Sequence, residues 1–177
     1  MDKYYYFASQ LPSLSFKQDS FPSKQYFLEE GEKWLSKKDI DVIVELKLDN
    51  YKIQNEKLSF LKKWLNFENS LRTEISKYRK ARSEDSQFKS KMFSSSILKE
   101  KTPLQIEVMF LQLRWNFIEK MKFEHYSDLQ FLVLYYLQLQ ILDRLSLFDK
   151  EQGKEKFEEL IKISKNDPKK EQNIKEK

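Results

Sequence analysis

The sequence contains no cysteine, two glycines and one histidine among its 177 residues. The absence of cysteine excludes disulfides, thiolate metal sites and cysteine nucleophiles, and is typical of a reducing compartment. Gly31 and Gly153 are too few for a glycine-rich nucleotide loop or a nucleophile elbow, and His125 alone cannot form a histidine-rich zinc site. We therefore expect no metal or cofactor, which leaves an interaction protein or an enzyme that uses only carboxylates, lysines and arginines.

Long hydrophobic runs are also missing. The most apolar stretch, residues 129–142, contains three glutamines and is shorter than the ~20 apolar residues that a membrane helix needs. The apolar run near the N-terminus is too short for the core of a signal peptide. We therefore predict a cytoplasmic protein with no membrane span. Its net charge of +5 is spread along the chain, which permits contact with an anionic partner without requiring it.

Scarce glycine and proline between long periodic stretches predict an all-α protein, a bundle of about five to seven helices. The aromatic run Tyr4–Phe7 favours a short extended segment at the N-terminus. We expect one helical domain over residues 1–164 and a polar, disordered tail over residues 165–177.

Capping signals and apolar periodicity place the helices. Helices are predicted at residues 23–35 with Ser23 as cap, from Asp39 onward, at 57–82, at 102–123 with a Thr102–Gln105 capping box, from a Ser127–Gln130 cap to about 148, and after Gly153. The helix at 102–123 has two nearly opposite apolar faces, which indicates neighbours on both sides. The serine-rich residues 83–101 read as a long connection, a candidate for mobility or partner contact.

Arginine is used sparingly, because only five of the 33 basic residues are arginine. All lie on the three long predicted helices, in or beside apolar faces in most cases: Arg72, Arg79, Arg82, Arg114 and Arg144. A lysine-rich chain keeps arginine where a rigid, bidentate, always-charged group is needed. One interpretation is that these residues connect helices through Glu68, Glu107 and Asp143. The other is that they form a docking face for an acidic partner surface.

Two further hypotheses use other patterns. The basic residues between Arg72 and Arg82 suggest a nucleic-acid-binding helix, although no recognition motif accompanies them. His125, Tyr126 and Asp128 form a corner between helices, where a histidine commonly satisfies helix-end groups. An enzyme with a carboxylate centre near Glu124 and Asp128 would require a deep pocket there.

Six segments occur along the chain in a particular order: Lys3-Tyr4-Tyr5-Tyr6 followed by Leu11-Pro12, Ser70-Leu71-Arg72 continuing to Tyr78-Arg79-x-Ala81-Arg82, Leu113-Arg114-Trp115-x-Phe117, Phe123-x-His125-Tyr126-x-Asp128, Leu139-Gln140-Ile141-Leu142-x-Arg144, and Phe148-Asp149-x-Glu151-x-Gly153. In this order they resemble an uncharacterised bacterial family whose genes lie within V-type ATPase operons. None of these segments is catalytic.

The resemblance implies a function. The operon position of that family is similar to that of the C (eukaryotic d) subunit, an all-helical adaptor that seats the central stalk on the membrane rotor ring. It implies a non-catalytic subunit or accessory protein at the inner face of the cytoplasmic membrane, with stalk subunits and the rotor ring as partners. Nucleic-acid binding is the alternative.

Overall fold

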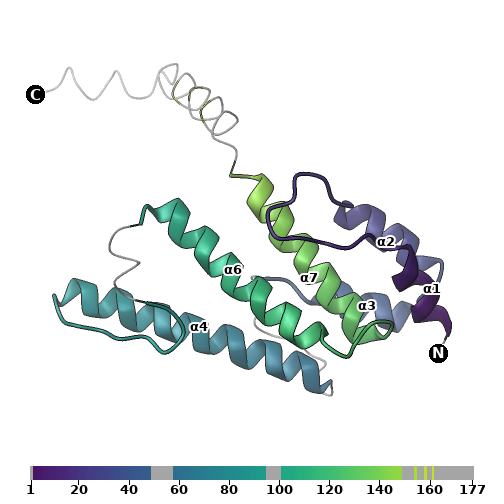
Figure 1. The fold of residues 1–177 in the computed structure, drawn as a ribbon, viewed down its shortest axis with the longest axis horizontal. Helices are drawn as coiled ribbons and strands as arrows, with labels where there is room; N and C mark the ends of the chain where they lie inside the picture. The colour runs from purple at the N-terminus through teal and green to yellow at the C-terminus, as the bar shows by residue number, and fades with distance from the viewer. Residues whose placement is uncertain are drawn as a thin grey trace, which may run out of the picture. The chain divides into compact units, whose positions relative to one another are not determined.

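The computed structural model describes residues 2–48, 58–94 and 101–148, together with Lys154, Glu158 and Ile161. These residues form helices and contain no strand, which confirms the predicted all-α class (Figure 1). The helices that can be delimited are α1 (Asp2–Gln10), α2 (Lys24–Glu32), α3 (Lys37–Glu45), α4 (Ser59–Ser83), α6 (Pro103–Lys122) and α7 (Leu129–Ser146). The chain divides into two units, Met1–Leu145 and Ser146–Lys177.

The N-terminal aromatic run is helical, so the prediction of an extended segment over Tyr4–Phe7 is wrong. In α1, Phe7 is fully buried and its ring lies 5.1 Å from that of Phe27, while Tyr5 and Tyr6 are exposed. Lys3 and Tyr4 both donate to the Asp39 carboxylate on α3, at 2.7 and 3.2 Å. These tertiary contacts outweigh the local β preference of consecutive aromatics.

Side-chain caps define the starts of α2 and α3. Ser23 accepts a hydrogen bond from the Tyr26 backbone, as predicted. Ser36 and Asp39 form a reciprocal capping box, so α3 begins at Lys37, two residues before the predicted start. α2 and α3 pack closely at Gly31, where an added Cβ would lie 3.3 Å from Cδ1 of Ile40.

In Figure 1, α6 lies between α4 and α7, as its two apolar faces predict. Its buried residues come from both faces: Phe110, Leu111, Trp115, Ile118 and Met121. The predicted Thr102–Gln105 capping box is present, with Pro103 in the first turn. Against α4, the ring of Phe117 stacks on that of Phe67 with centroids 4.0 Å apart.

α7 forms the centre of the core, because residues 132–139 are all buried, as are Ile141 and Leu142. Its predicted cap is wrong. The Oδ1 atom of Asp128, not Ser127, accepts a hydrogen bond from the Phe131 backbone at 2.8 Å. The Gln130 side chain instead donates to the Met121 carbonyl at the end of α6.

The first part of the predicted connection folds back against α4. The Glu74 carboxylate accepts hydrogen bonds from the Ser90 hydroxyl at 2.7 Å and the Lys91 backbone at 3.2 Å. Phe93 is buried, and its ring lies 5.5 Å from that of Phe110. Residues 84–94 therefore contribute to the core beside α4 and α6.

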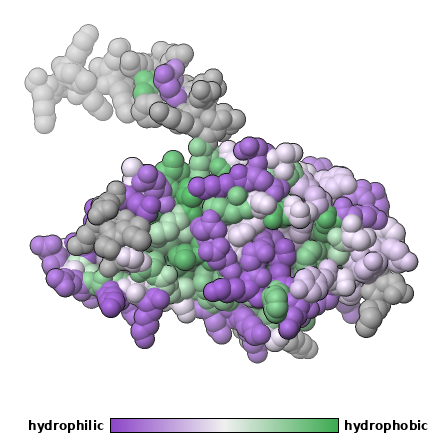
Figure 2. All heavy atoms as spheres, in the orientation of Figure 1, coloured by the Kyte–Doolittle hydropathy of each residue, from purple (hydrophilic) through white to green (hydrophobic). Residues whose placement is uncertain are grey.

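The C-terminal predictions fall almost entirely outside the described residues. Lys154, Glu158 and Ile161 are helical, while the boundary at residue 164 and the tail at 165–177 stay predictions. Within the described part of the chain, no helix combines the length and the apolar character needed to cross a membrane. Figure 2 shows apolar side chains reaching the surface in patches bordered by hydrophilic ones.

Candidate functional site

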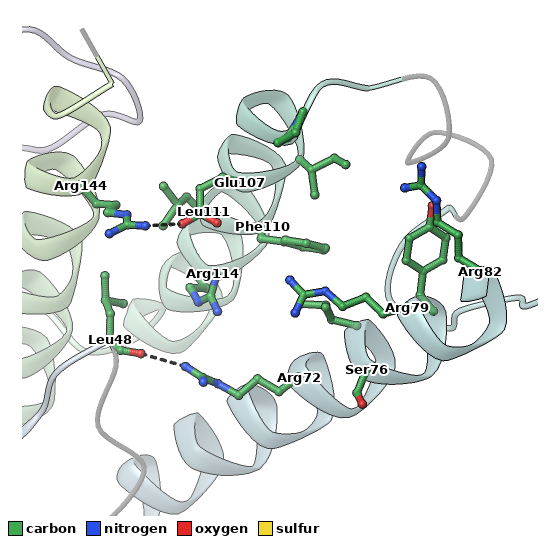
Figure 3. A pocket seen from close by; sticks show the side chains of 14 residues that line it. Leu48, Arg72, Ser76, Arg79, Arg82, Glu107, Phe110, Leu111, Arg114 and Arg144 are labelled. Carbon is green, nitrogen blue, oxygen red and sulfur yellow. Dashed lines mark hydrogen bonds and ion pairs between the residues drawn. The ribbon is translucent and has the colours of Figure 1, made fainter. Parts of the chain in front are cut away.

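All five arginines of the chain line one cleft between α4, α6 and α7, with a volume of about 760 Å³ (Figure 3). Arg72, Arg79 and Arg82 come from α4, Arg114 from α6 and Arg144 from α7. Among the residues that the structure describes, no lysine lines the cleft, although lysine is the commoner basic residue in this chain. Because guanidinium groups bind oxyanions through paired hydrogen bonds, this cleft is the candidate functional site.

Two of the arginines that line the cleft, Arg72 and Arg114, bind the carboxylate of Glu68, which does not itself line it. Glu68 is only 2% exposed. Arg114 donates from Nε to Oε1 at 2.6 Å and from Nη2 to Oε2 at 3.2 Å, and Arg72 donates from Nε to Oε2 at 3.3 Å. The predicted pairing of Glu68 with Arg72 is confirmed, and the bond to Arg114 connects α4 to α6.

The same cluster reaches the chain after α3. Arg72 Nη2 donates to the Leu48 carbonyl at 3.2 Å, as the dashed line in Figure 3 marks. From α7, Gln140 donates to the Leu46 carbonyl at 2.8 Å and accepts from the Leu48 backbone at 3.0 Å. Sequence reasoning missed Gln140, whose only signal was that it is one of three glutamines in a largely apolar stretch. Side chains of α4 and α7 therefore hold one short backbone segment.

A second ion pair connects α6 and α7. Arg144 Nη2 lies 3.3 Å from Oε1 of Glu107, and both side chains are partly exposed. Asp143, proposed from the sequence as another arginine partner, pairs with Lys24 of α2 at 2.8 Å. The interpretation that arginines connect helices is thus confirmed for Arg114 and Arg144, whereas Arg72 pairs with Glu68 within α4 and donates to Leu48, after the end of α3.

Arg79 and Arg82 differ from the other three. Both are exposed, and neither forms a hydrogen bond or ion pair with any residue that the structure describes. In Figure 3, Arg79 points into the space between α4 and α6, and Arg82 lies one turn further along α4. Neighbouring Lys77 and Lys80 instead pair with Glu74 and Glu84 on α4 and its end. These two guanidinium groups are therefore available to an incoming anion.

The hydroxyl of Tyr78 also lies in this part of the molecule. Tyr78 lines the cleft and is 8% exposed, and its hydroxyl has no hydrogen-bond partner among the described residues. A buried hydroxyl without a partner is rare, because it loses hydration and gains nothing in return. Sequence reasoning identified Tyr78 only as an apolar-face residue, since an unmet hydrogen bond has no signature in a sequence.

The remaining cleft walls are mostly apolar. They include Ile75 on α4 and Ile106, Phe110 and Leu111 on α6. Positive groups therefore lie beside surfaces that favour aliphatic or aromatic groups. The cleft can hold an anionic ligand that also has apolar parts.

The corner between α6 and α7 is a separate feature, because His125, Tyr126 and Asp128 do not line the cleft. Nδ1 of His125 lies 2.5 Å from Oδ2 of Asp128, whose other oxygen caps α7. Glu124 is exposed and has a positive φ of 68°. Asp128 and His125 thus stabilise the turn, in agreement with the interpretation of His125 as a helix-end residue, while Tyr126 is exposed.

A second polar cluster lies within the packing of α6 and α7. The fully buried Gln138 accepts from Lys122 at 2.9 Å and donates to Glu119. Burial lowers the pKa of Lys122, against the opposing effect of Glu119 at 3.6 Å. Among the described residues, no group of three or more histidine, aspartate or glutamate side chains could hold a metal ion.

Comparison with known proteins gives one family. Residues 90–167 match a family model described as "Protein of unknown function (DUF2764)". The match covers less than half of the chain and includes α6 and α7, with Arg114 and Arg144. No curated protein and no solved structure matches the chain. Similarity to an uncharacterised family is therefore found over this segment.

Proposed function

We propose that this chain is a non-catalytic subunit or accessory protein of a bacterial V-type ATPase, placed like the C (d) subunit between the central stalk and the membrane rotor ring. One observation of the structure supports an adaptor function: all five arginines meet in one cleft, where Arg79 and Arg82 have no partner among the described residues. The V-type ATPase as the assembly comes from the sequence resemblance.

The ion pairs beside the cleft suit an adaptor that transmits force. Glu68 connects α4 to α6 through Arg114, and Glu107 connects α6 to α7 through Arg144. The Glu68–Arg114 pair is almost completely buried, so it has a narrow range of favourable geometries and restricts the relative positions of α4 and α6. The Glu107–Arg144 pair is more exposed and restricts α6 and α7 less. A coupling protein of a rotary motor requires such restricted movement.

The two unpaired arginines would provide the contact to the partner. Arginine is enriched at the energetic centres of protein interfaces. A partner surface that carries carboxylates would complement the cleft and increase the association rate. In this proposal the protein lies at the inner face of the cytoplasmic membrane and is held there by other subunits.

Affinity capture from native membranes tests the proposal. We expect the tagged full-length protein to recover V-type ATPase subunits, identified by mass spectrometry. The double variant Arg79→Gln/Arg82→Gln should recover them at about a tenth of the wild-type level or less, since two charge-assisted contacts are lost.

The matched control is Lys62→Gln/Lys63→Gln, which removes the same charge from exposed positions on the same helix. This variant should recover the subunits as the wild type does. Recovery of no ATPase subunit by the wild type would contradict the proposal. Affinity for nucleic acid that falls steeply with salt concentration would instead favour the nucleic-acid alternative.

A further inference from the structure

We infer that the arginine cleft binds an acidic amphipathic helix of a partner protein, an inference that rests on the proposed function. It specifies the chemistry of the partner element and assigns the contact to Arg79, Arg82 and Tyr78. Three features of the cleft carry it: the spacing of its charges, the apolar walls beside them, and the unsatisfied hydroxyl of Tyr78.

The spacing of the arginines fits an elongated ligand. Arg79 and Arg82, which have no partner among the described residues, lie three residues apart on α4. Arg72, which already donates to Glu68 and Leu48, lies seven residues before Arg79, so the positive row spans about 15 Å along the helix axis. Positions seven residues apart lie on nearly the same side of a helix. A compact anion such as phosphate reaches only one end of this row. A helix lying beside α4 presents carboxylates over the same length at the same intervals.

The apolar walls favour a ligand with two chemically different sides. Ile75, Ile106 and Phe110 line the cleft together with the charged groups. An inorganic polyphosphate leaves these surfaces exposed to water. An amphipathic helix places carboxylates on the arginines and aliphatic side chains against the walls, which is a common mode of helix recognition in grooves.

The Tyr78 hydroxyl and the two exposed arginines supply directional contacts. The Tyr78 hydroxyl lacks a partner in the described structure, and a partner carboxylate at this point can accept its hydrogen bond. The guanidinium groups of Arg79 and Arg82 offer paired donors that fit carboxylate geometry better than lysine does. Binding would therefore satisfy a hydroxyl that folding leaves unpaired.

Fluorescence polarisation with the full-length protein tests the inference. The probe is a labelled synthetic helix of about 18 residues, with glutamates spaced like the three arginines and leucines on the adjacent face. The control peptide has the same composition in an order that mixes the two faces. We expect the amphipathic peptide to bind at least about tenfold more tightly than the control, because only it segregates charge from apolar surface.

Protein variants locate the binding site. Arg79→Gln/Arg82→Gln should weaken peptide binding about 10- to 100-fold, and Tyr78→Phe about fivefold, as expected for charged and neutral hydrogen bonds. Lys62→Gln/Lys63→Gln should change binding less than about twofold. The four charged positions are exposed, and Tyr78→Phe keeps the buried ring and removes only a hydroxyl that has no hydrogen-bond partner within the described structure, so circular dichroism should show wild-type folding in each variant.

Three results would overturn the inference: equal binding of both peptides, unchanged binding in the double arginine variant, or displacement of the peptide by pyrophosphate at micromolar concentration.

The failure of this inference can be distinguished from the failure of the proposed function. If ATPase subunits are captured but the peptide does not bind, the acidic helix is wrong and the adaptor function stands. If the peptide binds and no ATPase subunit is captured, the docking chemistry stands and the assigned assembly is wrong.

Discussion

Individual arginines of the cleft differ in what their loss would cost. The Arg114 side chain is 12% exposed and makes two hydrogen bonds to a carboxylate that is almost completely buried. Arg72 shares that carboxylate but is 34% exposed. Arg79 forms no bond within the described residues. The arginines of the cleft therefore serve two purposes. Arg114 and Arg72 stabilise the fold, and Arg79 is available to a ligand.

Replacing Arg114 tests this division. We expect Arg114→Ala to lower the free energy of unfolding by about 3 kcal/mol, because Glu68 would keep a buried charge with a single, weaker partner. Arg72→Ala should cost about 1–2 kcal/mol, since its guanidinium is better hydrated in the folded state. Urea denaturation at neutral pH measures both.

The control for these variants is Arg79→Ala, which should stay within about 0.5 kcal/mol of the wild type. An equal loss of stability in Arg79→Ala and Arg114→Ala would show that the distinction between buried and available arginines is wrong. Arg114→Lys should recover little, because an ammonium group cannot reproduce the bidentate contact.

At the level of helices, the start of α7 depends on which of two neighbouring side chains accepts a hydrogen bond from the first turn of the helix. Ser127 and Asp128 are both good N-cap residues, and Ser127–Gln130 matches the capping-box pattern. In the structure Asp128 caps α7, while the Gln130 side chain donates a hydrogen bond to the Met121 carbonyl. The contact with α6 therefore selects between two local solutions of similar energy.

Cap replacements distinguish the two residues. Asp128→Ala should lower the free energy of unfolding by about 1 kcal/mol, the usual cost of losing an N-cap. Ser127→Ala should change it by less than about 0.5 kcal/mol. Thermal or urea unfolding of the two variants provides the measurement, and the reverse order of their stabilities would indicate that Ser127 is the cap.

Across the folded unit, two carboxylates join segments distant in sequence and make stability depend on pH. Burial acts to raise the pKa of Asp39, but hydrogen bonds from Lys3 and Ser36 outweigh it, so the pKa lies below its ordinary value of 3.8. The hydrogen bond from Ser90 is the main reason that the pKa of Glu74 lies below 4.5. Both groups bind protons more readily in the unfolded chain.

Acid should therefore destabilise the fold. The contributions of Asp39 and Glu74 are present above about pH 4.5 and decrease as the pH falls through their folded-state pKa values. We expect the stability difference between the wild type and Asp39→Asn/Glu74→Gln to shrink between pH 7 and pH 3, measured by urea denaturation. Glu32→Gln, at an exposed residue without a partner in the described structure, should retain the wild-type pH dependence. A constant difference for the double variant would contradict the expectation.

Helix class, most helix positions and the sandwiched position of α6 follow from the amino-acid order alone. These features depend on apolar periodicity and on caps such as Ser23 and Thr102, which act within a few residues of chain. The pairing of Glu68 with Arg72 belongs to the same group, since a separation of four residues brings them together on any helix.

Other features of the fold could not be predicted from the sequence, because they depend on how the helices pack. α1 is helical because Phe7, Lys3 and Tyr4 find partners on α2 and α3, against the local preference of an aromatic run. The five arginines meet because α4, α6 and α7 pack in one particular register, which no spacing within a single helix specifies. Such contacts join residues far apart in the chain, so their energies depend on the relative positions of whole helices, and only the tertiary structure contains that information.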